Sequence, residues 1–148
     1  MAATDKSHTE AARALLEQSM ALYQKHGDEW GIARVLSDWG KLLFVEGEYA
    51  QAEAQSSKSL AKFQDLGDHF MTAMELSGMG ELARFREDYA GARQFHEQNL
   101  EIFRKLRGRF ALARPFVNLA WVCLRQGDER KARVLFEDSL KLFTKSNN

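Results

Sequence analysis

The sequence predicts an all-α fold, a solenoid of about seven stacked helices. Three observations support this prediction. The chain of 148 residues repeats itself at an offset of forty residues, its apolar residues follow helical spacing, and it contains one proline. A repeat of about 20 to 50 residues is typical of proteins in which each unit stacks on its neighbour and buries a continuous core. No segment shows the alternation of apolar and polar residues that a strand requires.

The repeat becomes visible when the sequence is shifted by forty residues. The coinciding positions are Ala33, Ala73 and Ala113; Ala52, Ala92 and Ala132; Leu60, Leu100 and Leu140; and Phe63, Phe103 and Phe143. The start of the chain carries half a unit, because Ala12, Met20 and Tyr23 are in register with Ala52, Leu60 and Phe63. The predicted organisation is a flexible tail at 1–9 and a single domain at 10–145, which holds a half repeat at 10–27 and repeats at 28–67, 68–107 and 108–145.

Each repeat is predicted to hold two helices. In the first repeat they run from Glu29 to Glu46 and from Tyr49 to Asp65. Gly47 follows the first helix, and glycine readily adopts the left-handed conformation that ends a helix. Asp128, at the corresponding turn of the third repeat, is expected to cap the next helix.

Small residues stand in the middle of the first helix of each repeat, at Gly40, Gly80 and Ala120. Glycine inside a helix costs about 1 kcal/mol relative to alanine. Its presence there indicates that a neighbouring helix approaches closely.

The pattern resembles the tetratricopeptide repeat over about residues 10–143. The matching residues are Trp39-Gly40, Gly47-Glu48-Tyr49, Ala52 and Ser59-Leu60; then Met79-Gly80, Asp88-Tyr89, Ala92 and Asn99-Leu100; then Leu119-Ala120, Gly127-Asp128, Ala132 and Ser139-Leu140. The usual unit has about 34 residues, and the longer unit here is similar to those of kinesin light chains, cell-polarity adaptors and large bacterial signalling ATPases and transcription activators. The resemblance implies a right-handed superhelix whose first helices line a concave face that binds a protein or peptide.

The resemblance also implies which residues face the ligand. The candidate peptide-binding residues are Arg34, Asp38, Lys41, Glu81, Arg84, Arg114, Asn118, Trp121 and Arg125. Trp121 corresponds to Lys41 and Glu81 in the other repeats, so the repeat core does not require a ring there. Two interpretations remain open for it, an anchor for the ligand or packing against a neighbouring helix.

The expected ligand is an acidic or C-terminal peptide, because arginine side chains suit carboxylates. Asn118 matches the asparagine with which co-chaperone members of the family hold a C-terminal carboxylate. Asp38 and Gly78 occupy the equivalent positions in the other repeats, which argues against a complete clamp of that kind.

Other classes of function find little support in the sequence. His8, His26, His69 and His96 show no metal-ligand spacing, and no phosphate-binding motif is present. Cys123 lies in an apolar run and is expected to be buried and inert. We therefore predict no catalytic residue, no metal site and no cofactor.

The charge pattern is balanced overall and uneven along the chain. Residues 1–74 carry 7 Lys and Arg against 11 Asp and Glu, a balance of −4, and residues 75–148 carry 14 against 10, a balance of +4. A balanced chain does not indicate a nucleic-acid partner. No apolar run is long enough for a membrane helix and the N-terminus has no signal-peptide core, so a cytoplasmic protein is expected.

Two alternatives to ligand binding on the concave face remain open. A solenoid exposes apolar surface at its ends, and here either end could pair with a second copy to form a homodimer. The apolar residues concerned are Leu15, Leu16, Met20 and Leu22 in the first helix and Val134, Leu135 and Phe136 in the last. The chain could also be an effector-sensing segment of a larger bacterial regulator.

Overall fold

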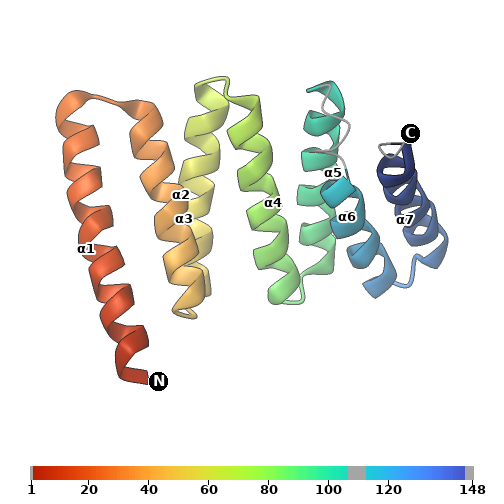
Figure 1. Ribbon diagram of the computed structural model, residues 1–148, viewed down its shortest axis with the longest axis horizontal. Helices are drawn as coiled ribbons and strands as arrows, with labels where there is room; N and C mark the ends of the chain where they lie inside the picture. The colour runs from red at the N-terminus through yellow and green to blue at the C-terminus, as the bar shows by residue number, and fades with distance from the viewer. Residues whose placement is uncertain (1, 107–112, 146–148) are drawn as a thin grey trace. The chain divides into compact units, whose positions relative to one another are not determined.

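The computed structural model describes residues 2–106 and 113–145, and their side chains from residue 6 onward. These residues form α-helices and no strands, which confirms the all-α prediction. The helices, labelled in Figure 1, are α1 (Ala2–His26), α2 (Glu29–Val45), α3 (Tyr49–Asp65), α4 (His69–Phe85), α5 (Tyr89–Lys105), α6 (Ala113–Arg125) and α7 (Glu129–Thr144). They belong to two compact units, residues 1–68 and 69–148, which are described separately below.

Helix α1 begins earlier than the sequence analysis predicted. It starts at Ala2, so residues 2–9, which were expected to form a flexible tail, are helical. The segment from Ala2 to His26 contains neither glycine nor proline, and alanine and glutamate recur in it. Such a composition favours the helical state, which gives the physical reason for the difference.

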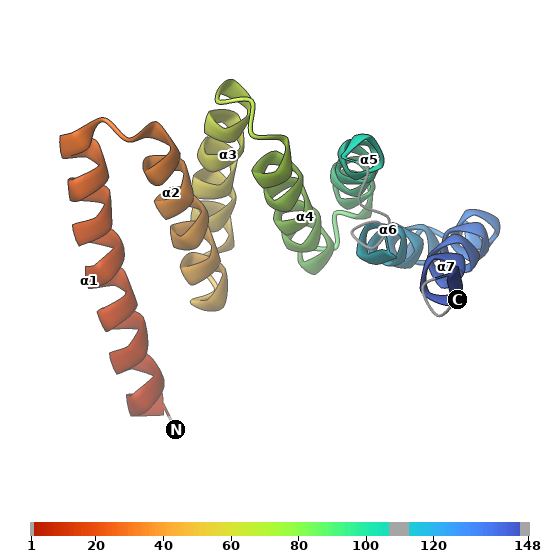
Figure 2. The ribbon, with the colours of Figure 1, turned by 45° about the horizontal axis from the view of Figure 1, so that its top comes forward.

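In the first unit, α2 and α3 form a helical hairpin and α1 packs beside α2 (Figure 2). Ala33 of α2, together with Ala52 and Phe63 of α3, is buried. The Trp30 ring meets Phe63 edge to face, with centroids 6.0 Å apart. Its indole Nε1 donates a hydrogen bond of 2.9 Å to Asp68 Oδ2. Trp30 therefore links the start of α2 to the turn that follows α3.

The second unit contains two hairpins, α4 with α5 and α6 with α7. They are joined through packing of α5 on α6. One core cluster of this unit consists of Leu100, Phe116, Leu119, Ala120, Cys123, Ala132 and Leu135. The Cys123 thiol is fully buried, as predicted, and desolvation raises its pKa.

The turn inside each hairpin uses a left-handed residue. Gly47 and Gly127 adopt φ values of 82° and 79°, which confirms the predicted role of Gly47. The second repeat has Glu87 at this place, with a φ of 63°. Asp88 and Asp128 then cap α5 and α7, because their side chains accept hydrogen bonds from the backbone N–H groups of Gly91 and Lys131. The cap predicted at Asp128 is thus confirmed.

Two repeat positions differ from their counterparts in burial. Leu100 and Phe103 are buried, whereas Leu140 and Phe143 of α7 are 62% and 56% exposed. Leu100 packs against residues of α6. Within the described residues no helix follows α7 to cover the corresponding side, which accounts for the exposure.

Candidate functional site

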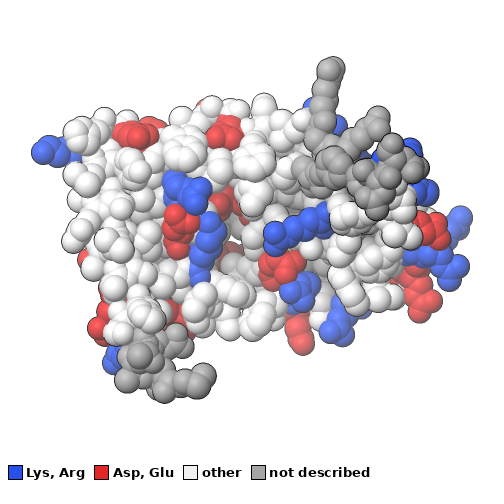
Figure 3. Space-filling view, viewed as in Figure 1, with Lys and Arg blue, Asp and Glu red and all other residues white. Residues whose placement is uncertain are grey.

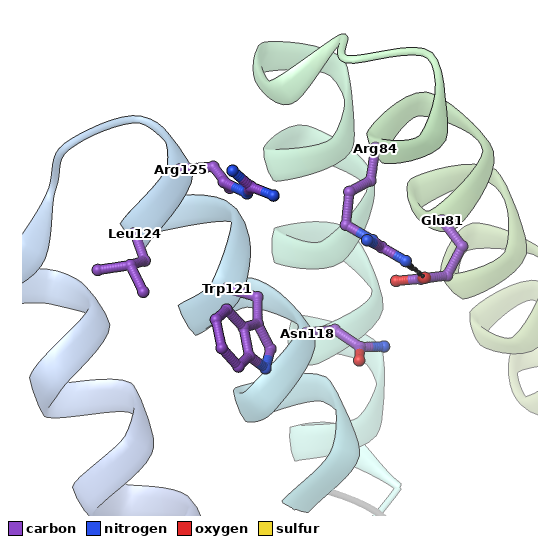
Figure 4. Close-up of a pocket in the computed structure, with 6 residues that line it drawn as sticks. All are labelled: Glu81, Arg84, Asn118, Trp121, Leu124 and Arg125. Atoms are coloured by element: carbon purple, nitrogen blue, oxygen red, sulfur yellow. Dashed lines mark hydrogen bonds and ion pairs between the residues drawn. The ribbon is translucent and has the colours of Figure 1, made fainter.

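A pocket of about 630 Å³ lies in the second unit between α4 and α6 (Figure 4). It is lined by Glu81, Arg84, Asn118, Trp121, Leu124 and Arg125. Five of these six side chains belong to the set proposed from the sequence. Helical geometry explains the grouping, since residues three, four or seven apart share one face of a helix.

Glu81 and Arg84 form an ion pair on the α4 side of the pocket. Arg84 Nη2 lies 2.7 Å and Nε 3.2 Å from the same carboxylate oxygen, Glu81 Oε2. The nearby imidazole of His96 and then Arg84 lower the pKa of Glu81 from 4.5 to about 2, against the opposing effect of partial burial. The Glu81 carboxylate is therefore ionised at neutral pH and raises the pKa of Arg84 in turn.

The α6 side presents polar and apolar groups together. Asn118 and Arg125 point across the pocket toward α4 (Figure 4), and no hydrogen bond or ion pair of either side chain occurs within the described residues. Leu124 and Trp121 contribute apolar surface and are 40% and 52% exposed. The pocket thus offers one unpaired guanidinium, one amide and an exposed indole.

Trp121 takes part in packing as well as in the pocket. Its ring meets Phe136 of α7 edge to face, with centroids 5.7 Å apart. Half of the side chain nevertheless remains exposed. Both interpretations of this residue left open by the sequence therefore agree with its position: one side packs on α7 and the other faces solvent in the pocket.

The remaining predicted residues lie outside this pocket. Arg34, Asp38 and Lys41 lie on α2 in the first unit, where Asp38 accepts from Arg34 Nε at 3.2 Å and from Lys41 Nζ at 2.9 Å. Arg114 is an exposed residue of α6 that does not line the pocket. Figure 3 shows basic and acidic side chains side by side on the visible face of each unit, in line with such local ion pairs.

The sequence analysis did not connect His96 with the site. This residue of α5 is fully buried, and its Nε2 lies 3.5 Å from Glu81 Oε1. The forty-residue alignment contained a partial signal, because it places Gly80 in register with Gly40 and Ala120, and a small residue inside a helix indicates that a neighbouring helix approaches closely. A Cβ atom at Gly80 would come within 2.6 Å of the imidazole.

The described residues also bear on metal binding and on the spanning of a membrane. They contain no group of three or more His, Cys, Asp or Glu placed to hold a metal ion. Among the same residues, no helix is both long and apolar enough to cross a membrane.

Comparison with known proteins also indicates a fold of paired helices. A family model described as tetratricopeptide repeat matches residues 72–145, half of the chain. The protein belongs to the tetratricopeptide repeat family, which confirms the resemblance drawn from the sequence. Members of this family generally serve as non-catalytic scaffolds that bind protein or peptide partners.

Two solved structures share the fold. BtubC (BKLC) from P. vanneervenii superposes with a TM-score of 0.88 at 21% identity, and the match covers 96% of this chain and 59% of that one. The chain therefore spans well under two thirds of the length of that relative. The N-terminal domain of stress-induced protein-1 (STI-1) from C. elegans gives a TM-score of 0.68 at 17% identity, covering 78% of this chain and 87% of that one. No curated protein matches the sequence.

Proposed function

We propose that the protein binds an acidic peptide segment of a partner protein in the pocket between α4 and α6. The observation that carries this proposal is the guanidinium of Arg125, which makes no hydrogen bond or ion pair within the described residues, beside the exposed indole of Trp121. Arginine binds carboxylates through two parallel hydrogen bonds, and tryptophan is a frequent anchor in interfaces. Asn118 can donate a further hydrogen bond, and Leu124 can contact an apolar side chain of the ligand.

The charge of the pocket favours this class of ligand. Arg84 and Arg125 contribute two positive charges and Glu81 one negative charge, so the pocket is positive overall. Because Arg84 is already paired with Glu81, Arg125 is expected to make the first contact. Whether the ligand carboxylate belongs to an internal side chain or to a C-terminus is decided by the experiment below.

The test uses Trp121 as the reporter. Replacing Trp30 and Trp39 by Phe leaves Trp121 as the sole tryptophan of the sequence. Its fluorescence is followed while acidic, neutral and basic hexapeptides are added, each with a free and an amidated C-terminus. We expect acidic peptides to change the emission, and a requirement for the free C-terminus would identify a terminal carboxylate as the group bound.

Two charge variants locate the binding. Arg125→Gln should weaken binding of the acidic peptide about tenfold or more, since a charge-assisted hydrogen bond contributes roughly 1.5 to 3 kcal/mol. Arg133→Gln removes the same charge from an exposed position of α7 outside the pocket and serves as the control. Equal weakening by both variants, or by neither, would contradict the proposed site.

A second candidate function is self-association through α7. Of the three residues predicted for this contact, Val134 is half exposed, whereas Leu135 is buried in the core cluster and Phe136 packs against it, so these two do not offer the predicted surface. Leu140 and Phe143 of the same helix are more than half exposed, and a contiguous exposed apolar patch marks an interaction site. Leu140→Glu should convert a dimer into a monomer in light scattering without loss of helicity. A wild-type protein that is monomeric at high concentration would dismiss this function.

A further inference from the structure

A buried histidine lies behind the proposed binding pocket. His96 of α5 has no exposed surface, and neither of its ring nitrogens makes a full hydrogen bond within the described residues. A charged group lies close to it, since Glu81 Oε1 of α4 is 3.5 Å from His96 Nε2. Buried polar atoms are normally satisfied, so an incompletely paired imidazole beside a pocket carboxylate calls for an explanation.

Packing alone does not require an imidazole here. His96 fills the space left by Gly80, because a Cβ at Gly80 would come within 2.6 Å of its Cε1. In the first repeat the corresponding pair is Gly40 with Ser56, and in the third repeat Phe136 packs against the cluster that contains Ala120. The position that holds His96 in the second repeat is therefore occupied by a small polar residue, Ser56, in the first repeat and by a large apolar residue, Phe136, in the third. Of these three side chains, His96 is the titratable one.

Glu81 connects this histidine to the pocket surface. Its Oε2 accepts both hydrogen bonds from Arg84, whereas its Oε1 faces His96. The two oxygens of one carboxylate thus serve an exposed arginine and a buried imidazole. An acidic ligand that takes Arg84 away leaves Glu81 with a negative charge, and a protonated His96, whose Nε2 lies 3.5 Å from Glu81 Oε1, can balance it.

We propose that His96 is a positioning residue that takes up a proton when an acidic ligand draws Arg84 away from Glu81. The protonated ring then neutralises Glu81 from inside the unit and frees Arg84 to bind the ligand together with Arg125. The proton comes from solvent and returns to it when the ligand leaves. This inference rests on the proposed binding of acidic peptides, and it adds that such binding depends on pH.

Glu81 is the counter-charge that the structure places beside His96. The other titratable or charged groups of α4, which packs against α5, are His69, the buried Glu75 and Arg84. On α6, which packs against α5, the titratable or charged groups are Arg114, Cys123 and Arg125. Cys123 remains a neutral thiol because burial raises its pKa. On α5 itself, Arg93 pairs with Glu97 and with Asp128 of α7, and Glu97 also pairs with Lys131 of α7.

The link between ligand binding and proton uptake by His96 determines how affinity changes with pH. If binding of the ligand takes up one proton, affinity rises as the pH falls. The carboxylates of the ligand titrate near 4 and so stay ionised between pH 8 and pH 6. We therefore expect affinity to be higher at pH 6 than at pH 8.

The first test needs no ligand. The imidazole of His96 is followed by NMR during a pH titration, and its signals are assigned by their loss in His96→Gln. Arg84→Gln imitates the bound state, since it removes the arginine from Glu81. We expect the protonation midpoint of His96 to rise by about one pH unit in this variant and to fall back in the double variant Glu81→Gln, Arg84→Gln. A midpoint that Arg84→Gln leaves unchanged would overturn the inference.

The second test uses a peptide of six glutamates that carries a tetramethylrhodamine label, and measures its binding by anisotropy at pH 6 and pH 8. Wild type should bind more tightly at pH 6, and His96→Gln should bind with nearly equal affinity at both values. Equal wild-type affinities would overturn the inference although the proposed function stands. Absence of binding at both values, with a raised midpoint in Arg84→Gln, would refute the acidic ligand and still support the link between His96 and Glu81.

Discussion

Asn99 of α5 donates from Nδ2 to the backbone carbonyl oxygen of Ala73 in α4, at 2.5 Å. The same bond occurs in the other two hairpins, from Ser59 Oγ to Ala33 at 2.9 Å and from Ser139 Oγ to Ala113 at 3.2 Å. All three donors are buried. Each hairpin is therefore held together by a polar contact that repeats every forty residues, in addition to its apolar core.

Removing one of these bonds should weaken a hairpin measurably. In Ser59→Ala the hydroxyl donor is lost, and a buried hydrogen bond contributes about 1 kcal/mol to stability. We expect the free energy of unfolding in urea to fall by that amount. Ser57→Ala, at an exposed position two residues earlier on α3, should change it little, and an equal loss in the two variants would contradict this role for Ser59.

Two glycines of α4 should respond in opposite ways to alanine. In Gly80→Ala the new Cβ would overlap the buried His96 ring, and overpacking costs about 1 to 3 kcal/mol. Gly78→Ala places its Cβ in open space and should stabilise the helix by up to about 1 kcal/mol. Thermal unfolding of both variants tests the pair.

The double variant Gly80→Ala, His96→Ala provides the control for this explanation. Its loss of stability should be smaller than the sum of the two single losses, because removal of the ring relieves the overlap. Strictly additive losses would show that the two residues do not compete for the same space.

The sequence was sufficient to predict the helices, since each depends on local spacing and on turn residues within the repeat. The second helix of the first repeat was predicted at Tyr49–Asp65, where α3 lies. Burial at the last repeat was less predictable. Leu140 and Phe143 match core residues in the alignment, but their burial depends on a neighbouring helix rather than on the repeat itself.

The site was predictable only in part, for a related reason. Five pocket residues were predicted from the resemblance and its helical register, whereas His96 lies behind the pocket on the second helix of the hairpin, where it approaches Glu81 and packs over Gly80. A contact of this kind depends on the identity of two residues on different helices. The periodicity reveals that Gly80 is small without revealing which side chain fills the gap.

Comparison of the repeats indicates a substitution that should improve the N-terminal cap of α3. The side chains of Asp28, Asp88 and Asp128 accept hydrogen bonds at the starts of α2, α5 and α7, whereas Glu48 at the start of α3 makes no such bond. Glu48→Asp places the shorter carboxylate where its counterparts bind, and a side-chain cap contributes about 1 kcal/mol. We expect a higher midpoint of urea unfolding; Glu48→Ala, which cannot cap, should not raise it.

Glu81 should make the stability of the protein depend on pH in the acidic range. Its folded-state pKa is lowered from 4.5 to about 2 by His96 and Arg84, so the unfolded chain binds a proton at a higher pH than the folded one. Stability from this group is present above about pH 4.5 and is lost as the pH falls toward 2. Urea unfolding of wild type and Glu81→Gln at several pH values measures the effect. The stability difference in favour of wild type should shrink across this window, and a difference independent of pH would show that the contacts of Glu81 with His96 and Arg84 do not stabilise its ionised form.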